Sequence, residues 1–361
     1  MSYTNGLDKP SDYFNTLTWT GDDTASRNLT GVGFQPDLVW GKARSRIGNH
    51  WLIDSNRGTT GSLYRVLNAD NTDSEQTTNN DGTTAYGIVT TIGSDGFTIA
   101  DGNQGDLNVN NSGDTYVAWN WLAGGSASSN SDGSITSSVS ANTTAGFSIV
   151  SYTGTGSAST VGHGLSSTPQ VYIIKNRTNA RNWQSYHEPL GNQAYLRLNT
   201  TGSASTGASI WNNTSPTSSV FSIGTSSFNA VNSSGDNYIA YCFAEKKGFS
   251  KFGSYTGNGN ADGTFVYTGF KPAWLLVKNT SIARDWQIFD NKRLGYNVDN
   301  NYLFANLSDA EGTADRVDIL SNGFKWRTDA NTYNASGNNY IYMAFAENPL
   351  VGTNNIPATA R

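Results

Sequence analysis

Short apolar runs separated by polar turn residues along the chain predict a series of short β-strands. Runs of β-branched and aromatic residues, such as PDLVWGK, PQVYIIK and PAWLLVK, are bounded by turn residues, and helical periodicity is absent over any useful length. These runs are apolar at successive positions, so both faces should be covered, as in a strand at the centre of a sandwich. Glycine occurs 39 times and interrupts the chain every few residues. The pattern therefore predicts an all-β fold.

This strand pattern occurs three times. Each copy begins with an aromatic residue before Thr-Gly, and a proline follows 17 residues after that aromatic residue. A lysine lies six residues after the proline, and an aromatic or imidazole ring lies 14 residues after it. The aromatic residues are Trp19, Tyr152 and Tyr255; the prolines are Pro36, Pro169 and Pro272; the lysines are Lys42, Lys175 and Lys278; the rings are His50, Trp183 and Trp286. The copies end on SGDTYVAWNW, SGDNYIAYCF and SGNNYIYMAF. These ungapped spacings predict three units with superposable cores.

We expect three tandem, related antiparallel β-sandwich (jelly-roll-like) units, at residues 1–125, 126–247 and 248–361. Here they are called units 1, 2 and 3. The Ser/Gly-rich segment 123–146 is expected to join units 1 and 2 as a linker, and EKKG (245–248) joins units 2 and 3. The sequence does not indicate the order of the strands.

Composition and charge narrow the possible partners. Charged residues make up 14% of the chain, the net charge is −5, and no block of consecutive Lys or Arg occurs, so we expect no nucleic-acid partner. The single cysteine, Cys242, lies among strand-forming residues and is expected to be a buried apolar residue. The start of the chain lacks the features of a secretory signal, and no apolar run approaches the ~18 residues of a membrane helix, so we expect no membrane partner.

Two groups of residues could carry chemistry. His50 and Asp54 would lie on one face of a strand and could begin a metal site, but the other units carry Trp183 and His187, or Trp286 and Asp290, at these positions. A core ring is the simpler interpretation, and we predict no metal and no cofactor. The recurring lysines should cap an apolar strand face and pair with Asp54 or Asp290.

Hydrolysis of glycans would need two carboxylates on either side of one bond. The available carboxylates are Asp54, Glu188, Asp290, Glu245 and Glu347, and no pair of them recurs in all three units. No nucleophile motif occurs, and DGNQGD (101–106) is better explained as a turn than as a calcium loop. We therefore predict no catalytic residue.

Aromatic residues at repeated positions are expected in the cores, so unrepeated rings in the variable connections are the ones that could contact a ligand. The connections are 59–93, 191–219 and 295–319, and the candidate binding residues are Tyr64, Tyr86, Trp211 and Tyr302. Such rings among Asn, Thr and Ser can stack on sugars and form hydrogen bonds with them.

The repeat blocks themselves resemble a known family. GFQPDLVWGKARSRIGNHWLIDSNRG (33–58), SDGSITSSVSANTTAGFSIVSYTGTG (131–156), FSKFGSYTGNGNADGTFVYTGFKPAWLLVKN (249–279) and LSNGFKWRTDANTYNASGNNYIYMAFAENPLVG (320–352) are similar to virion structural proteins of tailed bacteriophages, many of them marine. Gly41 departs from the W-I-K-N-R pattern that is commoner in that family.

The resemblance implies a location in the virion, after assembly in the host cytoplasm, with other virion proteins as partners. It favours a homo-oligomer, a trimer above other states, and host-surface glycans as a candidate ligand. We expect a non-enzymatic adhesin head of a tail fibre or tail tip. The alternatives are a purely architectural role, as a capsid knob or tail connector, and a glycan depolymerase.

Overall fold

The structure is a computed structural model that describes residues 7, 9–61, 63–76, 88–100, 109–225, 230–293, 297 and 300–349. Within these residues the chain forms antiparallel β-strands, with two short 3-10 segments, η1 (Pro10–Asp12) and η2 (Glu188–Leu190). The predicted all-β fold class is confirmed.

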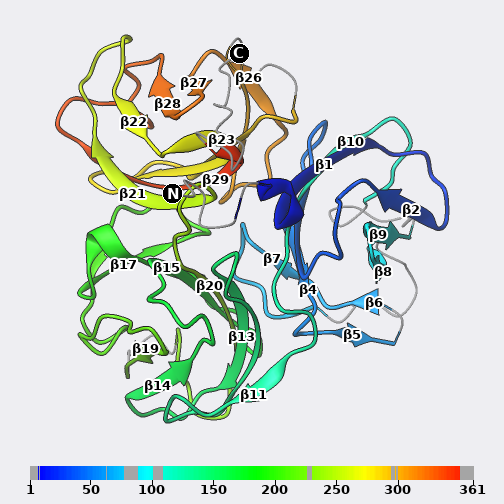
Figure 1. The fold of residues 1–361 in the computed structure, drawn as a ribbon, viewed down its shortest axis with the longest axis vertical. Helices are drawn as coiled ribbons and strands as arrows, with labels where there is room; N and C mark the ends of the chain where they lie inside the picture. The colour runs from blue at the N-terminus through cyan, green and yellow to red at the C-terminus, as the bar shows by residue number, and fades with distance from the viewer. Residues whose placement is uncertain are drawn as a thin grey trace.

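Three lobes surround a common centre (Figure 1), and each contains one large sheet. The sheet of unit 1 has the order β1 (Phe14–Thr20), β10 (Thr115–Trp121), β3 (Leu38–Ala43), β4 (Trp51–Asp54) and β7 (Leu67–Asn68). The sheet of unit 2 has the order β11 (Ser128–Asn130), β12 (Ser137–Asn142), β13 (Phe147–Thr153), β20 (Asn237–Phe243), β15 (Val171–Asn176), β16 (Gln184–His187), β17 (Ala194–Arg197) and β18 (Ser205–Thr206). The sheet of unit 3 has the order β21 (Ser250–Thr256), β29 (Asn339–Pro349), β23 (Phe270–Asn279), β24 (Gln287–Asp290), β25 (Asn300–Phe304) and β26 (Gly312–Ala314).

The strand order is the same at the heart of the three sheets. The strand that opens each repeat pairs with the strand that closes it, and the closing strand pairs with the strand near the repeated proline. Pro36 and Pro169 lie two residues before β3 and β15, whereas Pro272 lies inside β23 at an irregularity in its pairing with β29. The repeated blocks of sequence therefore occupy matching strands.

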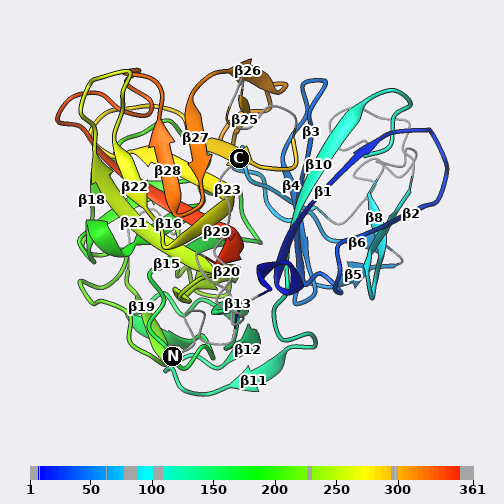
Figure 2. The same cartoon turned by 45° about the horizontal axis from the view of Figure 1, so that its top comes forward.

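A smaller sheet covers the outer face of each large sheet. These sheets are β2 (Arg27–Thr30), β9 (Gly96–Ile99) and β8 (Val89–Gly93) in unit 1; β14 (Ser159–Gly162) and β19 (Val220–Ile223) in unit 2; and β22 (Phe265–Tyr267), β28 (Gly323–Trp326) and β27 (Val317–Leu320) in unit 3. A further hairpin joins β5 (Thr59–Thr60) and β6 (Leu63–Tyr64). The small sheets lie at the periphery, as β2 and β8 do in Figure 2. Each pair of sheets encloses its own apolar core, which gives a sandwich-like packing.

The aromatic residue and glycine that open each repeat have a common structural role. Trp19, Tyr152 and Tyr255 stack on the closing tyrosine of their own unit, with ring centroids 5.3, 5.1 and 4.9 Å apart. A Cβ atom on Gly21 would lie 1.9 Å from the carbonyl oxygen of Asn111, and Gly154 and Gly257 have equally close backbone contacts. The motif recurs because the closing turn packs directly against the glycine.

The large sheets are buried on both faces because their inner faces meet in a single central core. This core includes Trp40 and Trp121 from unit 1, Ile173 and Phe243 from unit 2, and Trp274 from unit 3. A cavity of about 20 Å³, lined by these and other apolar side chains, has room for about one water molecule. The successive apolar positions in the sequence therefore reflect one sandwich core outside each large sheet and one shared core inside.

The Ser/Gly-rich segment 123–146 is more ordered than a linker. It contains β11 and β12, which extend the large sheet of unit 2, and Val139 and Ala145 are buried. Small polar residues allow the backbone pairing of these strands without apolar side chains on both faces, so the composition concealed them.

Candidate functional site

The three repeated lysines tie the units together in a cycle. Lys42 Nζ donates to the carbonyl oxygen of Ser308 in unit 3 at 3.1 Å, and Lys175 Nζ donates to that of Thr72 in unit 1 at 3.0 Å. Lys278 Nζ donates to the carbonyl oxygen of Thr201 in unit 2 at 2.8 Å. Each lysine thus donates to the unit that precedes its own, and Lys42 of unit 1 closes the cycle by donating to unit 3.

These lysines lie in an apolar setting that alters their protonation. All three residues are fully buried. Burial lowers the pKa of Lys175 to about 7 and the pKa values of Lys42 and Lys278 to about 8. The predicted pairing with Asp54 or Asp290 is wrong, because Asp54 pairs with Arg57 and Asp290 with Arg293.

The repeated ring position makes a second cyclic contact. Trp183 Nε1 donates to the carbonyl oxygen of Asn68 in unit 1 at 2.7 Å, and Trp286 Nε1 donates to that of Arg197 in unit 2 at 3.0 Å. His50 Nε2 lies 2.8 Å from the carbonyl oxygen of Phe304 in unit 3. His50 therefore takes the place of an indole, as the repeats predict.

The contacts of His50 define its chemical state. A carbonyl oxygen only accepts, so Nε2 carries the proton, while Nδ1 accepts from Trp40 Nε1 at 2.9 Å. Burial, together with nearby Lys42, holds the pKa of His50 well below its ordinary value, so the ring is neutral. Both ring nitrogens are occupied, and the described residues contain no group of three His, Cys, Asp or Glu side chains that could hold a metal ion.

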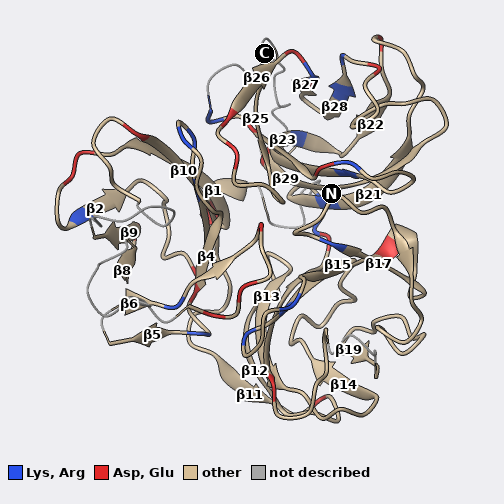
Figure 3. Cartoon of the chain, turned by 180° about the vertical axis from the view of Figure 1, so that it is seen from behind, with Lys and Arg blue, Asp and Glu red and all other residues tan. Residues whose placement is uncertain are grey.

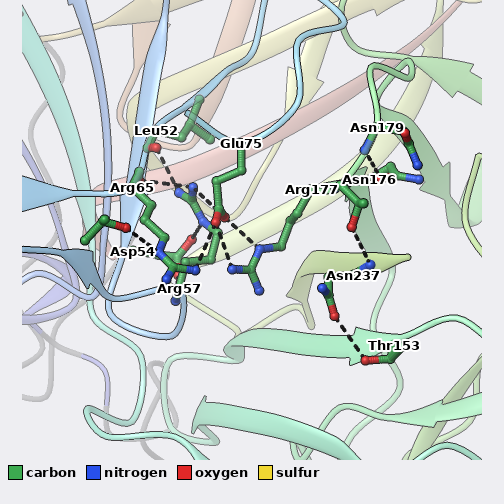
Figure 4. A network of polar contacts seen from close by, with 12 residues as sticks. Leu52, Asp54, Arg57, Arg65, Glu75, Thr153, Asn176, Arg177, Asn179 and Asn237 are labelled. Atoms are coloured by element: carbon green, nitrogen blue, oxygen red, sulfur yellow. Dashed lines mark hydrogen bonds and ion pairs between the residues drawn. The ribbon is translucent and has the colours of Figure 1, made fainter. Parts of the chain in front are cut away.

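A chain of alternating charges crosses the boundary between units 1 and 2 (Figure 4). Asp54 binds Arg57 through a 2.5 Å contact between Oδ2 and Nε, and Arg57 lies 3.7 Å from Glu75. Glu75 in turn accepts from Arg177 of unit 2 at 2.7 and 2.9 Å. Burial opposes the charge on Arg57, but Asp54 and the other nearby acidic groups raise its pKa. The network joins two units through buried, mutually neutralised charges.

The boundary between units 3 and 1 repeats this network. Asp290 binds Arg293 at 2.6 Å, Arg293 binds Glu311 at 2.9 Å, and Glu311 accepts from Arg44 of unit 1 at 2.8 Å. A ring or hydroxyl from the next unit completes each network: Trp119 Nε1 donates to Asp290 at 2.9 Å, and Tyr241 donates to Asp54 at 2.7 Å.

The boundary between units 2 and 3 lacks these charges. Here His187, Leu190, Ala204 and Thr280 occupy the positions of Asp54, Arg57, Glu75 and Arg177, and Leu190 and Ala204 pack against the central core. The backbone contact is kept, because the Ala204 N–H donates to the carbonyl oxygen of Thr280 at 3.1 Å as Glu75 does to Arg177 at 2.9 Å. All four positions that are charged at the boundary of units 1 and 2 are therefore occupied by His, Leu, Ala and Thr at this boundary.

The predicted binding residues do not form a common site. Trp211 is fully buried, donates to the carbonyl oxygen of Ala194 at 2.9 Å and packs edge-on against Tyr172, so its prediction as a ligand contact is wrong. Tyr64 and Tyr302 are half-buried against the outer cores of units 1 and 3. Tyr86 lies outside the described residues. The location of a ring in a connection that varies between repeats therefore does not predict that its side chain is exposed.

Sequence reasoning missed two exposed rings. Phe265 and Tyr267 on β22 are 44% and 58% exposed, and Ile47 is the other large hydrophobic residue exposed in the described part of the chain. They follow the opening motif of unit 3 in TFVYTGF, which lies outside the variable connections where ligand contacts were expected. Strict alternation around the buried Val266 is the signal that could have found them.

The chain was compared with protein families, curated proteins and solved structures. A family model described as a domain of unknown function, DUF7483, matches residues 9–349. The chain belongs to this family. No curated protein and no solved structure matches it. The single DUF7483 match spans all three repeats, in agreement with a central core that includes residues from each of them.

Proposed function

We propose that this DUF7483 protein is a non-enzymatic structural protein of a bacteriophage virion, and that it forms the host-recognition head of a tail fibre or tail tip. The likeness of its repeat blocks to virion structural proteins supports the phage setting. The observation that carries the structural role is the cycle of contacts from Lys42, Lys175 and Lys278 around the shared core. The lysines at repeated positions therefore connect the units to one another.

The arrangement of the lobes supports the recognition role. Repeated positions are concentrated in the cores and at the boundaries, whereas the small sheets and their connections lie outside and differ between units. Charged residues are sparse along the ribbon (Figure 3). A rigid centre with a variable, polar periphery suits a protein that holds binding surfaces on a particle.

Four of the five carboxylates considered for a depolymerase, Asp54, Asp290, Glu245 and Glu347, are held in ion pairs, which gives that alternative little support. Asp54 and Asp290 are buried and paired with Arg57 and Arg293, so they cannot reach a polysaccharide. Glu245 accepts from Lys251 at 2.9 Å and from the backbone of Phe252 at 2.7 Å.

The proposal is tested by location and competition. Antibody-gold labelling of the intact virion should place the protein at the tail fibre or tail tip, and the purified chain should reduce adsorption of the phage to host cells. Labelling of the capsid shell or tail interior, with adsorption unchanged, would favour the architectural alternative. Shortening of host polysaccharide by the pure protein would favour the depolymerase.

A further inference from the structure

The exposed rings Phe265 and Tyr267 lie side by side on one face of a sheet. They occupy alternate positions of β22, the edge strand of the sheet β22-β28-β27, while Val266 between them is 6% exposed and belongs to the outer core of unit 3. Side chains two residues apart on a strand point to the same side, about 7 Å from each other. Both rings therefore face outward as a pair.

The same positions in the other units show that the fold does not need these rings. Phe265 pairs with Lys325 across the sheet, as Asn28 pairs with Thr98 in unit 1 and Thr160 with Ser222 in unit 2. The residues equivalent to Tyr267 are Thr30 in unit 1 and Gly162 in unit 2. In unit 1, both Asn28 and Thr30 are exposed. The fold is maintained with Asn, Thr or Gly at these positions, so we infer that the exposed rings serve a purpose other than packing.

The surface beside the rings is polar but locally neutral. Lys325 is ion-paired with Asp262 at 2.6 Å, and Arg327 is ion-paired with Asp318. The side chain of Asp262 is 75% exposed and that of Arg327 is 42% exposed, so both can reach a ligand. Two cations and two carboxylates offer donors and acceptors for hydroxyl groups without a net charge.

The Phe265 ring lies close to strand β28. Tyr267 pairs across the sheet with Gly323, which is buried, and a Cβ atom there would lie 2.0 Å from the carbonyl oxygen of Val266 and 3.2 Å from the ring of Phe265. The absence of a side chain at Gly323 therefore lets the Phe265 ring lie against β28 while the residue stays 44% exposed. This leaves a surface with two aromatic rings beside polar groups.

We propose that the outer face of β22-β28-β27 binds a neutral oligosaccharide, which stacks on Phe265 and Tyr267 and forms hydrogen bonds with Asp262 and Arg327. This inference rests on the proposed host-recognition function and names its ligand class. Aromatic rings offer an apolar face to a sugar ring, and neighbouring polar groups can bind its hydroxyl groups. A stable protein partner would need about 1,000 Å² of interface with an apolar centre, far more than two rings among paired charges provide.

Grafting of the unit 1 residues tests the proposal without disturbing the fold. The variant F265N/Y267T reproduces the pair at the matching strand of unit 1, and N28A/T30A is the matched control on that strand. The full chain is applied to a microarray of neutral and acidic bacterial surface glycans, and affinity for the strongest neutral glycan is measured by calorimetry. We expect F265N/Y267T to lose at least tenfold in affinity and N28A/T30A to keep it.

Three results would overturn the proposal: failure to bind any neutral glycan, binding of acidic glycans alone, or equal affinity in F265N/Y267T and the parent chain. Greater protection of β22 from hydrogen exchange in the intact virion than in the isolated chain would also overturn it, since another virion protein would then cover this face. Competition for adsorption separates the two proposals. If F265N/Y267T blocks adsorption as well as the parent chain does, the recognition role stands and this site is wrong; if neither protein blocks adsorption, the proposed function fails.

Discussion

At the scale of single residues, the structure places charged groups where water is excluded and satisfies them with backbone carbonyls. Lys175 Nζ donates to the carbonyl oxygens of Thr72 and Arg181 at 3.0 and 2.8 Å. Carbonyl dipoles stabilise an ammonium group less well than a carboxylate would, so burial remains the dominant effect on its pKa. The lysine therefore contributes to the boundary as a hydrogen-bond donor and carries an electrostatic penalty when protonated.

This penalty predicts an unusual dependence of stability on pH. Burial lowers the pKa of Lys175 from 10.5 to about 7, so the unfolded chain binds more protons than the folded chain between these pH values. The contribution of Lys175 to stability therefore rises with pH across this window, by up to about 1.4 kcal/mol per pH unit. The melting temperature of Lys175→Met should rise less between pH 7 and 9 than that of the parent chain.

Lys251→Met is the matched control, because the Lys251 side chain is 42% exposed and pairs with Glu245 at the surface. Its melting temperature should follow the parent chain over the same pH range. An identical pH slope in Lys175→Met and the parent chain would show that Lys175 titrates normally.

At the scale of strands, one cross-strand pair combines side chains of different size in different repeats: a glycine faces a tryptophan in unit 1, and an aliphatic residue faces a glutamine in units 2 and 3. Gly41 on β3 pairs with Trp51 on β4, whereas the matching pairs are Ile174 with Gln184 and Val277 with Gln287. A Cβ atom on Gly41 would lie 2.0 Å from the ring of Trp51. Glycine at position 41 thus makes room for one large ring in the outer core of unit 1.

This difference predicts a compensating pair of substitutions. Gly41→Val should destabilise the chain by about 2 kcal/mol or more, because the rigid ring and strand must move to admit the side chain. Gly41→Val combined with Trp51→Gln reproduces the pairing of unit 3 and should recover part of this loss. Thermal or denaturant unfolding of both single variants and the double variant measures the coupling. Additive effects would contradict this compensation.

The strands show how far the sequence alone could be used. Periodicity and spacing predicted the all-β class, the matching strands and the ring role of His50, because local runs of residues reveal strands and equal spacings in three repeats reveal equivalent positions. The contacts of Lys42 with Ser308 and of Arg44 with Glu311 join positions more than 260 residues apart, and no local pattern encodes such a contact. Trp211 was misjudged for the same reason, since tertiary packing of its loop decides its burial.

At the scale of the whole molecule, the three boundaries are unequal. Units 1 and 2, and units 3 and 1, are joined by a buried charge network, while the boundary of units 2 and 3 has His187 with its Nε2 3.1 Å from the carbonyl oxygen of Tyr342. Burial lowers the pKa of His187 from 6.5 to about 4, although this hydrogen bond partly offsets the effect. Protonation would place an uncompensated charge in this boundary.

Acid should therefore loosen the boundary of units 2 and 3. Between pH 6.5 and 4 the unfolded chain binds a proton at His187 that the folded chain does not, so this contribution to stability falls as pH falls, by up to about 1.4 kcal/mol per unit. Buried, neutral His50 places the same kind of penalty on the boundary of units 3 and 1, so β16 itself is the strand to follow. Between pH 7 and 5, hydrogen exchange in β16 should lose less protection in His187→Gln than in the parent chain, whereas His163→Gln, at a buried histidine outside the central core, should behave as the parent chain does. Equal loss of protection in the parent chain and His187→Gln would contradict this.

The cyclic contacts also predict how a single unit behaves when it is separated from the others. Residues 126–247 alone would expose the inner face that carries Phe147, Ile173 and Phe243. An apolar sheet face of this kind is unstable in water and needs a partner. Unit 2 contains both halves of the cycle, because it holds the donors Lys175 and Trp183 as well as the acceptor carbonyls of Thr201 and Arg197.

Copies of the fragment 126–247 should therefore close into a ring of three, since the contact runs head to tail and the parent chain closes after three units. Light scattering coupled to gel filtration should give a trimer, and Ile173→Asp, placed at the centre of the inner face, should prevent it. The full chain already covers these inner faces within one molecule. A homotrimer of the full chain would therefore have to form through the outer surfaces. Ile173→Asp would affect such a trimer only by destabilising the fold of each chain. A folded, monomeric fragment would show that the inner sheet is stable without the shared core, and that the three repeats are independent domains held side by side.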